Sequence, residues 1–274
     1  MKRSLGCFLL ALAAAVSADA QVLGAAGGGS SVAVTIALPG GVGADLSIRF
    51  ESAVGLSPAN LGISAQLVDP HDPALLARLP AGTAIPAGFP ALLRIEPPAA
   101  GGLAFRGIAT IDLHTENLQY ASGSPLRLFA APLGGPFEDI TCYMGAGSYR
   151  ARGTRGGFSE FLLVNDSRPL AQVVPAKLDR LQQTLDANAG SMPAALYSDL
   201  AARLAAARAD VRDGDTADAI DEVDGFLAVV ARHGGTDIPD VWRSARDLVD
   251  VAGLLRAGGL TLRFSLALQY ELGS

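Results

Sequence analysis

The spacing of the apolar residues changes near Pro175, and this change constrains the fold more than any other feature of the sequence. From about 32 to 165, short alternating or β-branched runs at 32–36, 46–50, 109–113 and 158–164 are separated by Gly and Pro clusters. Such runs predict antiparallel strands. Beyond Pro175 the apolar residues recur at helical spacing. We therefore predict a multi-domain α+β chain, with an antiparallel, immunoglobulin-like β-sandwich over 32–172 and a helical module over 175–257.

The helical module is predicted to contain four amphipathic helices. Leu178, Leu181 and Leu185 mark the first, which ends near Gly190. The second begins after Ser191, a good N-cap, and the third begins at Asp215 after a tight turn. The fourth follows Pro239 and ends at 258–259, where two glycines adjoin. Four such helices form two hairpins that can close a small core, so we expect a self-contained appendage.

This helical pattern resembles the FIMAH module, a helical unit found near the C-termini of exported bacterial proteins. The resemblance is carried by Gly190, the turn at 213–216, the run 217–220, and Phe226 and Val230 before a glycine pair. The whole chain, including 125–129, 157–161 and 261–266, also resembles an uncharacterised family of exported Gram-negative proteins. Neither resemblance implies a known activity.

The C-terminal segment 260–272 alternates apolar and polar residues without a break. This alternation predicts a long strand, and a lone strand cannot satisfy its backbone hydrogen bonds. We therefore expect 260–272 to return to the β-sandwich as its last strand. A strand donated to a neighbouring molecule and an outer-membrane barrel strand are the alternatives.

The first twenty residues have the three zones of a signal peptide. Lys2 and Arg3 precede an apolar run at 7–16, and the small residues Ala18 and Ala20 precede the predicted cleavage site. The run is too short to cross a bilayer comfortably, although a permanent anchor is an alternative. We predict export to the periplasm or the cell exterior, no membrane insertion of the mature chain, and a flexible lead over 21–31.

Composition favours a globular chain without nucleic acid partners. Half of the residues are hydrophobic (50%), 18% are charged, and the net charge is −6. An acidic chain has no general attraction for nucleic acid or anionic lipid. Removal of the signal peptide would leave Cys142 as the only cysteine, so no disulfide within the chain is expected. A buried hydrophobic role is the simpler interpretation of Cys142, and a reactive thiol the alternative.

No catalytic or metal-binding motif is found in the sequence. Ser159 lacks the second glycine of a nucleophile elbow, and no phosphate-binding loop is present. Asp112, His114 and Glu116 would share one face of a strand, where three neighbours cannot converge on one metal ion. The four aspartates near the 213–215 turn lack the order of a calcium loop. We therefore predict no catalytic residue, no metal and no cofactor.

One local basic cluster is the best candidate for ligand binding. Arg150, Arg152 and Arg155 lie near Tyr143 and Tyr149, and guanidinium groups can hold a carboxylate or a sugar acid. A ligand site of this kind requires Arg150 and Arg152 to be exposed and free of internal carboxylate partners. The alternative is that these arginines lie on the solvent-exposed rim of a hairpin and hold no ligand.

These observations predict a non-catalytic exported module for binding or assembly, with another envelope protein or a polysaccharide as its partner. The alternative is a hydrolase of an envelope polymer, in which the fold brings carboxylates such as Glu138, Asp139 or Glu160 together.

Overall fold

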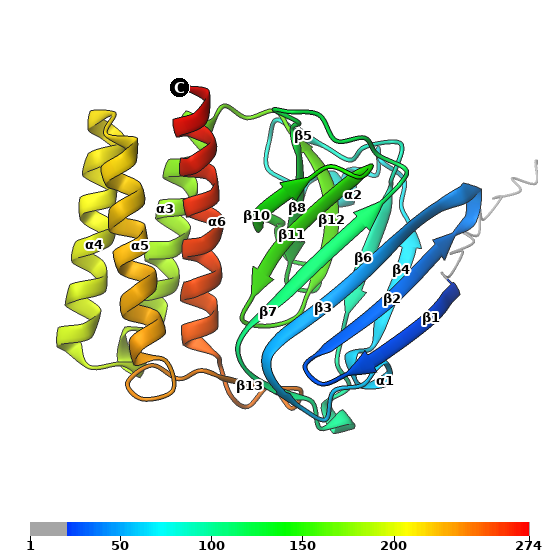
Figure 1. The fold of residues 1–274 in the computed structure, drawn as a ribbon, viewed down its shortest axis with the longest axis horizontal. Helices are drawn as coiled ribbons and strands as arrows, with labels where there is room; N and C mark the ends of the chain where they lie inside the picture. The colour runs from blue at the N-terminus through cyan, green and yellow to red at the C-terminus, as the bar shows by residue number, and fades with distance from the viewer. Residues whose placement is uncertain (1–20, 274) are drawn as a thin grey trace, which may run out of the picture.

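The computed structural model describes residues 21–273 and consists of antiparallel sheets on one side and long helices on the other (Figure 1). The predicted combination of antiparallel strands and helices is therefore confirmed. The predicted signal peptide over 1–20 lies outside the described residues.

Two antiparallel sheets form the β part. The first has the strand order β1-β2-β3-β7-β11-β10, with β13 also pairing with β7, and the second has the order β4-β6-β12-β8-β9, with β5 also pairing with β12. The first sheet comprises β1 Gln21–Gly28, β2 Ser31–Leu38, β3 Val42–Val54, β7 Ala104–Thr115, β10 Thr141–Gly145, β11 Tyr149–Arg155 and β13 Val241–Arg243. The second comprises β4 Ile63–Leu67, β5 Thr83–Ala84, β6 Ala91–Ile95, β8 Leu126–Ala131, β9 Glu138–Asp139 and β12 Glu160–Asp166. Two short helices, α1 Pro58–Leu61 and α2 Pro73–Leu76, lie in the connections.

The two sheets enclose one apolar core. Ile36 of β2 and Ile48 of β3 belong to the same buried cluster as Leu93 of β6 and Phe161 of β12. Alternate residues of β2 are buried, which is the pattern that the sequence showed in this region. An immunoglobulin-like arrangement of these strands stays a prediction.

The segment 21–31 is not the flexible lead that its Gly-Ala composition predicted. Most of it forms β1, which pairs with β2 along its length, and the turn contains Gly29 with φ of 60°. Strand pairing uses backbone groups only, so a segment with few side chains to pack can still add an edge strand.

The four long helices are α3 Leu170–Ala187, α4 Ala194–Asp213, α5 Thr216–His233 and α6 Val251–Leu272. The first three confirm the predicted helices in this region. Together with α6 they enclose a second buried cluster. Its members include Leu200, Phe226 and Leu262. In Figure 1, α6 lies between the other helices and the sheets, and it contacts β7, β10 and β11.

The prediction of a strand over 260–272 is wrong, and the prediction of a fourth helix after Pro239 is wrong in its first part. Residues 240–250 form β13 and a loop, the rest of the predicted helix is the start of α6, and 260–272 is the second half of α6. The glycines expected to end a helix lie inside α6. A Cβ at Gly258 would lie 2.9 Å from Leu181 Cδ1, and one at Gly259 would lie 2.7 Å from Leu227 Cδ2. These glycines therefore allow α6 to approach α3 and α5 closely.

Within residues 21–273, α6 is the one helix whose length and apolar composition would suffice to cross a membrane. About half of its most apolar window, 56%, is buried inside the protein. A core helix of a soluble protein can have the same length and apolar composition.

Gly156 marks the close approach between the end of β11 and the start of α6. A Cβ at this position would lie 2.5 Å from Leu254 N and 2.7 Å from Gly253 C. We expect Gly156→Ala to lower the free energy of unfolding by about 1–3 kcal/mol, because backbone atoms of α6 must move to admit the methyl group. Urea unfolding measures this loss. Gly190→Ala is the matched control, since a Cβ there meets nothing within 4 Å. Equal effects of the two variants would contradict the expectation.

Candidate functional site

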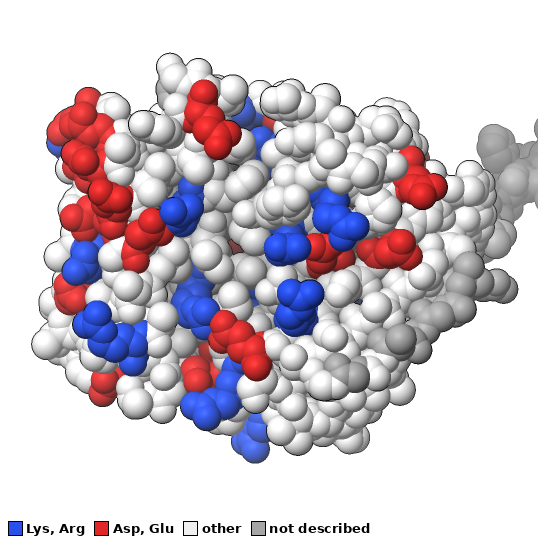
Figure 2. Space-filling view, viewed as in Figure 1, with Lys and Arg blue, Asp and Glu red and all other residues white. Residues whose placement is uncertain are grey.

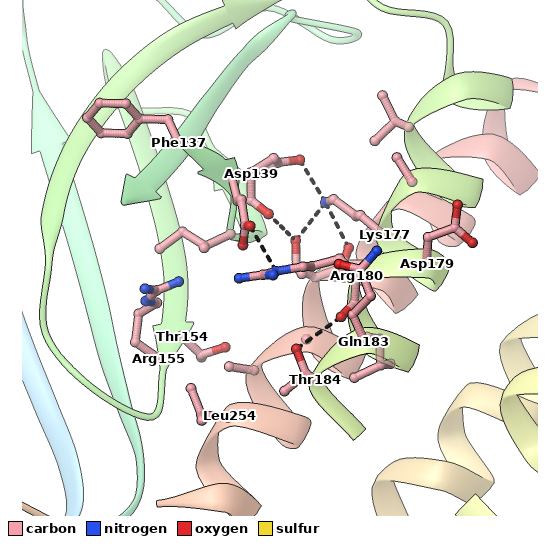
Figure 3. Close-up of a pocket in the computed structure, with 18 of the residues that line it drawn as sticks. Phe137, Asp139, Thr154, Arg155, Lys177, Asp179, Arg180, Gln183, Thr184 and Leu254 are labelled. Carbon is pink, nitrogen blue, oxygen red and sulfur yellow. Dashed lines mark hydrogen bonds and ion pairs between the residues drawn. The ribbon is translucent and has the colours of Figure 1, made fainter. Parts of the chain in front are cut away.

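A cavity of about 590 Å³ lies between the β part and the helices. The β part contributes Thr154 and Arg155 at the end of β11 and Glu138 and Asp139 of β9. The helices contribute side chains of α3 and α6. Figure 3 shows Thr154 and Arg155 on one side of this cavity and Lys177 and Arg180 on the other. We refer to it as the interlayer cavity.

A buried ion pair forms one wall of the interlayer cavity. Lys177 Nζ of α3 lies 2.7 Å from Asp139 Oδ2, and both side chains are buried. Lys177 also donates hydrogen bonds to Thr261 Oγ1 at 2.6 Å and to Ser265 Oγ at 2.9 Å. Burial alone would raise the pKa of Asp139, but attraction and hydrogen bonding from Lys177, with further hydrogen bonds from Thr141, hold that pKa below its usual value. The pair therefore joins β9, α3 and α6.

A second ion pair in the same wall is more exposed. Arg180 Nε lies 2.8 Å from Glu138 Oε1, and the arginine side chain is 55% exposed. Apart from Arg155, the other charged residues of the lining are also paired, Arg168 with Asp166 and Asp179 with Arg208.

Arg155 differs from the other charged residues of the cavity. Among the described residues its guanidinium makes one hydrogen bond, from Nη2 to Ser159 Oγ at 2.9 Å, and no ion pair. Its Nε is buried and has no hydrogen-bond partner there. Burial lowers the pKa of Arg155, and repulsion from Arg180 adds to this effect, while Glu138 opposes it. A half-buried cation without an anionic partner is unfavourable, so this position is suited to an anion.

Thr154 is the second unpartnered donor of the interlayer cavity. Its hydroxyl oxygen is buried and has no hydrogen-bond partner in the described part of the chain. Thr154 precedes Arg155 on β11, and both residues line the cavity. Buried polar groups in proteins are nearly always hydrogen-bonded, so two neighbouring exceptions indicate a place for a ligand.

The predicted arginine cluster is divided by the structure. Arg150 Nη1 and Arg152 Nη2 lie 2.8 Å from the two carboxylate oxygens of Asp112, so the prediction that they lack carboxylate partners is wrong. The reason is the strand register, in which Arg152 lies opposite Asp112 of β7. Figure 2 shows the same mixture on one face, where basic and acidic side chains adjoin over the strands.

The two predicted tyrosines lie outside the interlayer cavity. Tyr149 is fully buried in the sheet core, where its hydroxyl donates to Leu126 O at 2.8 Å. Tyr143 is 44% exposed, and the Arg152 guanidinium lies 5.1 Å from the centre of its ring. Arg155 is therefore the one member of the predicted cluster that lines the cavity.

Other residues considered from the sequence have structural partners. His114 Nε2 lies 2.8 Å from Gly147 O, and in residues 21–273 no group of three or more His, Cys, Asp and Glu residues could hold a metal ion. Cys142 is half-buried and unbonded, and burial raises the pKa of its thiol to about 11. Ser159 is buried and accepts the hydrogen bond from Arg155.

The carboxylates named for a hydrolase are all held by cations. Glu160 is buried between Arg78 and Arg94, and its Oε1 lies 2.8 Å from Arg94 Nε. Burial would raise the pKa of Glu160, but hydrogen bonds from Arg78 and Arg94 lower it. Glu138 and Asp139 form the pairs already described. None of the three is an unpaired carboxylate.

Sequence reasoning missed Lys177, Thr154 and Arg180 as lining residues. These residues come together only in the folded protein, where α3 and the end of β11 line the same cavity, and no local pattern shows this. One signal was available: Lys2 and Lys177 are the only lysines, and Lys177 adjoins the apolar stripe of its helix.

No curated protein and no solved structure matches the chain. A family model described as a family of unknown function, DUF6689, matches residues 8–270. This match spans nearly the whole chain and agrees with the expected uncharacterised family. The chain therefore belongs to this family of unknown function.

Proposed function

We propose that this protein is a non-catalytic binding module that takes a carboxylate-bearing ligand in the interlayer cavity. The observation that supports this most directly is the pair of buried, unpartnered donors, Arg155 Nε and the Thr154 hydroxyl, in one cavity. Every other charged side chain of the lining has an opposite charge beside it. An anion would supply the acceptors and the charge that Arg155 lacks among the described residues.

A carboxylate suits this site better than a point anion. The guanidinium group is planar, and its N–H groups match the two oxygens of a carboxylate. Cavities that bind small molecules are mostly apolar with a few polar groups that orient the ligand, and Phe137 and Leu254 provide apolar lining here.

The proposal retains the wider setting predicted from the sequence. The zones of residues 1–20 support export to the periplasm or beyond, in keeping with the resemblance of the helical pattern to a unit of exported proteins. The partner would then be an envelope protein or a polysaccharide that carries carboxylates, with no nucleic acid involved. The hydrolase alternative is less favoured, since Glu138, Asp139 and Glu160 are each engaged by a cation.

We expect Arg155→Gln to weaken binding of small carboxylates by about tenfold to a hundredfold, the range expected when a charge-assisted hydrogen bond is lost. Calorimetric titration with 3-phenylpropanoate, succinate and glucuronate measures this effect. Arg150→Gln is the matched control, because it removes an arginine of the same strand that is bound to Asp112. Equal losses in both variants, or no binding of any carboxylate to the wild type, would reject the proposal.

A further inference from the structure

A second cavity of about 340 Å³ adjoins the interlayer cavity. The two cavities share four lining residues, namely Pro132, Arg155, Gly156 and Leu254. Arg155 Nη2 donates a hydrogen bond to Ser159, which lines the second cavity. The charged side chains that act on Arg155 are Glu138 and Arg180, which line the interlayer cavity. The Arg155 guanidinium therefore lies at the junction of the two cavities.

Much of the second cavity is apolar. The rings of Phe158 and Trp242 line it and meet edge to face, with their centres 5.2 Å apart. Three further lining residues are large hydrophobic side chains that remain exposed, namely Leu133, Leu248 and Val249. Apolar side chains that gather around an open cavity are typical of a binding surface. The second cavity thus offers an apolar wall that begins beside a cation and reaches the protein surface.

Acidic residues of the second cavity disfavour a second anion there. Three of them line it, namely Glu96, Glu160 and Asp250. Glu160 forms the pairs described above, and Asp250 accepts a hydrogen bond from Gly253 N at the start of α6. Like charges that are brought together repel each other. A ligand with its carboxylate on Arg155 is therefore expected to place an uncharged part in the second cavity.

We propose that the second cavity takes the alkyl chain of a free fatty acid whose carboxylate is held by Arg155 at the junction. This inference rests on the proposed function, because both assign the ligand carboxylate to Arg155. An alkyl chain brings no charge to the acidic residues and needs no hydrogen-bond partner from the apolar wall. Because Leu248 and Val249 extend that wall to the surface, a long chain gains more contact than a single ring does.

A chain-length series tests this inference on the full chain. Calorimetric titration with hexanoate, octanoate and decanoate, each below its micelle-forming concentration, should show affinity rising about fourfold for each added CH₂ group. Decanedioate carries a second carboxylate at the far end and should bind about tenfold more weakly than decanoate. Arg155→Gln should weaken all three fatty acids by the same factor and leave the gain for each CH₂ group unchanged.

The position of the alkyl chain can be read from tryptophan fluorescence. Trp242 is the only tryptophan of the sequence, and it lines the second cavity but not the interlayer cavity. The terminal bromine of 10-bromodecanoate quenches tryptophan emission on contact, so this ligand should quench Trp242 whereas decanoate should not. A bound bromodecanoate that leaves the emission unchanged would place the chain elsewhere and overturn the inference.

A variant of the apolar wall separates the chain from the carboxylate. Leu248 is 40% exposed, so Leu248→Ser is expected to fold. It should weaken decanoate binding about fivefold and hexanoate binding less, because the longer chain has more contact to lose. Val54→Ser is the matched control, since Val54 is also an exposed hydrophobic residue but does not line the cavity. Equal effects of the two variants on decanoate would contradict the inference.

The outcomes distinguish the two proposals. Equal affinity for hexanoate, octanoate and decanoate, all dependent on Arg155, would overturn the fatty acid inference and leave the carboxylate site in place. Binding to phosphatidylcholine vesicles, with no gain from chain length in solution, would also overturn it, in favour of a membrane surface. Failure of every carboxylate to bind, 3-phenylpropanoate included, would overturn both.

Discussion

The Lys177→Met variant should lose about 3–5 kcal/mol of its free energy of unfolding at pH 7, the usual cost of removing one partner of a buried ion pair. Methionine has a similar length and adds no branch, so packing around α3 changes little. The substitution leaves the Asp139 carboxylate buried without its cation, and it also removes the donor to Thr261 and Ser265. Urea unfolding followed by circular dichroism measures the loss.

Two further variants test the cause of this effect. The double variant Lys177→Met with Asp139→Asn should recover much of the stability, because no uncompensated charge then remains in the wall of the cavity. Arg180→Met breaks the more exposed pair with Glu138 on the same helix, and it should cost less than about 1 kcal/mol. A Lys177→Met variant as stable as Arg180→Met would show that the buried pair does not hold the helices to the sheet.

The strands of the β part could be predicted because their burial pattern is local. A strand with one face in the core alternates apolar and polar residues, as β2 and β3 do. The same logic failed for 21–31, where glycine and alanine gave no pattern although the backbone pairs with β2. Strand pairing uses backbone groups, so a segment of small residues can form a strand without an alternating pattern of apolar side chains.

The alternation in 260–272 misled the prediction because two of its polar residues are buried. Thr261 and Ser265 are four residues apart, which places them on one face of α6, and both accept hydrogen bonds from Lys177. Leu262 and Leu266 have the same spacing and are also buried. A pattern analysis that counts threonine and serine as outward-facing finds a period of two where the structure has a helix. The buried lysine that explains them lies more than eighty residues earlier in the chain.

The candidate site was only partly predictable for a similar reason. Arg155 was identified from its own neighbourhood, whereas the fate of Arg150 and Arg152 depended on which residue of β7 lies opposite them. Asp250 lies far from β11 in the sequence, and its backbone comes close to Gly156 only because the end of β11 packs against the start of α6. Register and packing between distant segments decide such sites.

The stability of the wild type should fall as the pH rises from about 4 to 7 relative to that of Asp250→Asn. Burial raises the pKa of Asp250 from 3.8 to about 7 in the folded protein. In this range the folded state holds a proton that the unfolded state has released, so each pH unit removes about 1.4 kcal/mol of the contribution from this group. The contribution is complete below pH 4 and levels off above pH 7. Across the range the difference amounts to as much as about 4 kcal/mol.

Comparison with the variant isolates Asp250 from the other titrating groups. The charged groups that act on it are Asp240 and Glu51, which raise its pKa, and Arg256, which lowers it, while Arg155, Glu160 and Arg246 line the adjoining cavity. Asparagine does not ionise, so the free energy of unfolding of Asp250→Asn minus that of the wild type should grow steadily between pH 4.5 and 7. Asp215→Asn should show no such growth, because Asp215 is exposed. Urea unfolding at four pH values measures both, and a difference that stays constant with pH would show that Asp250 is ionised in the folded protein throughout.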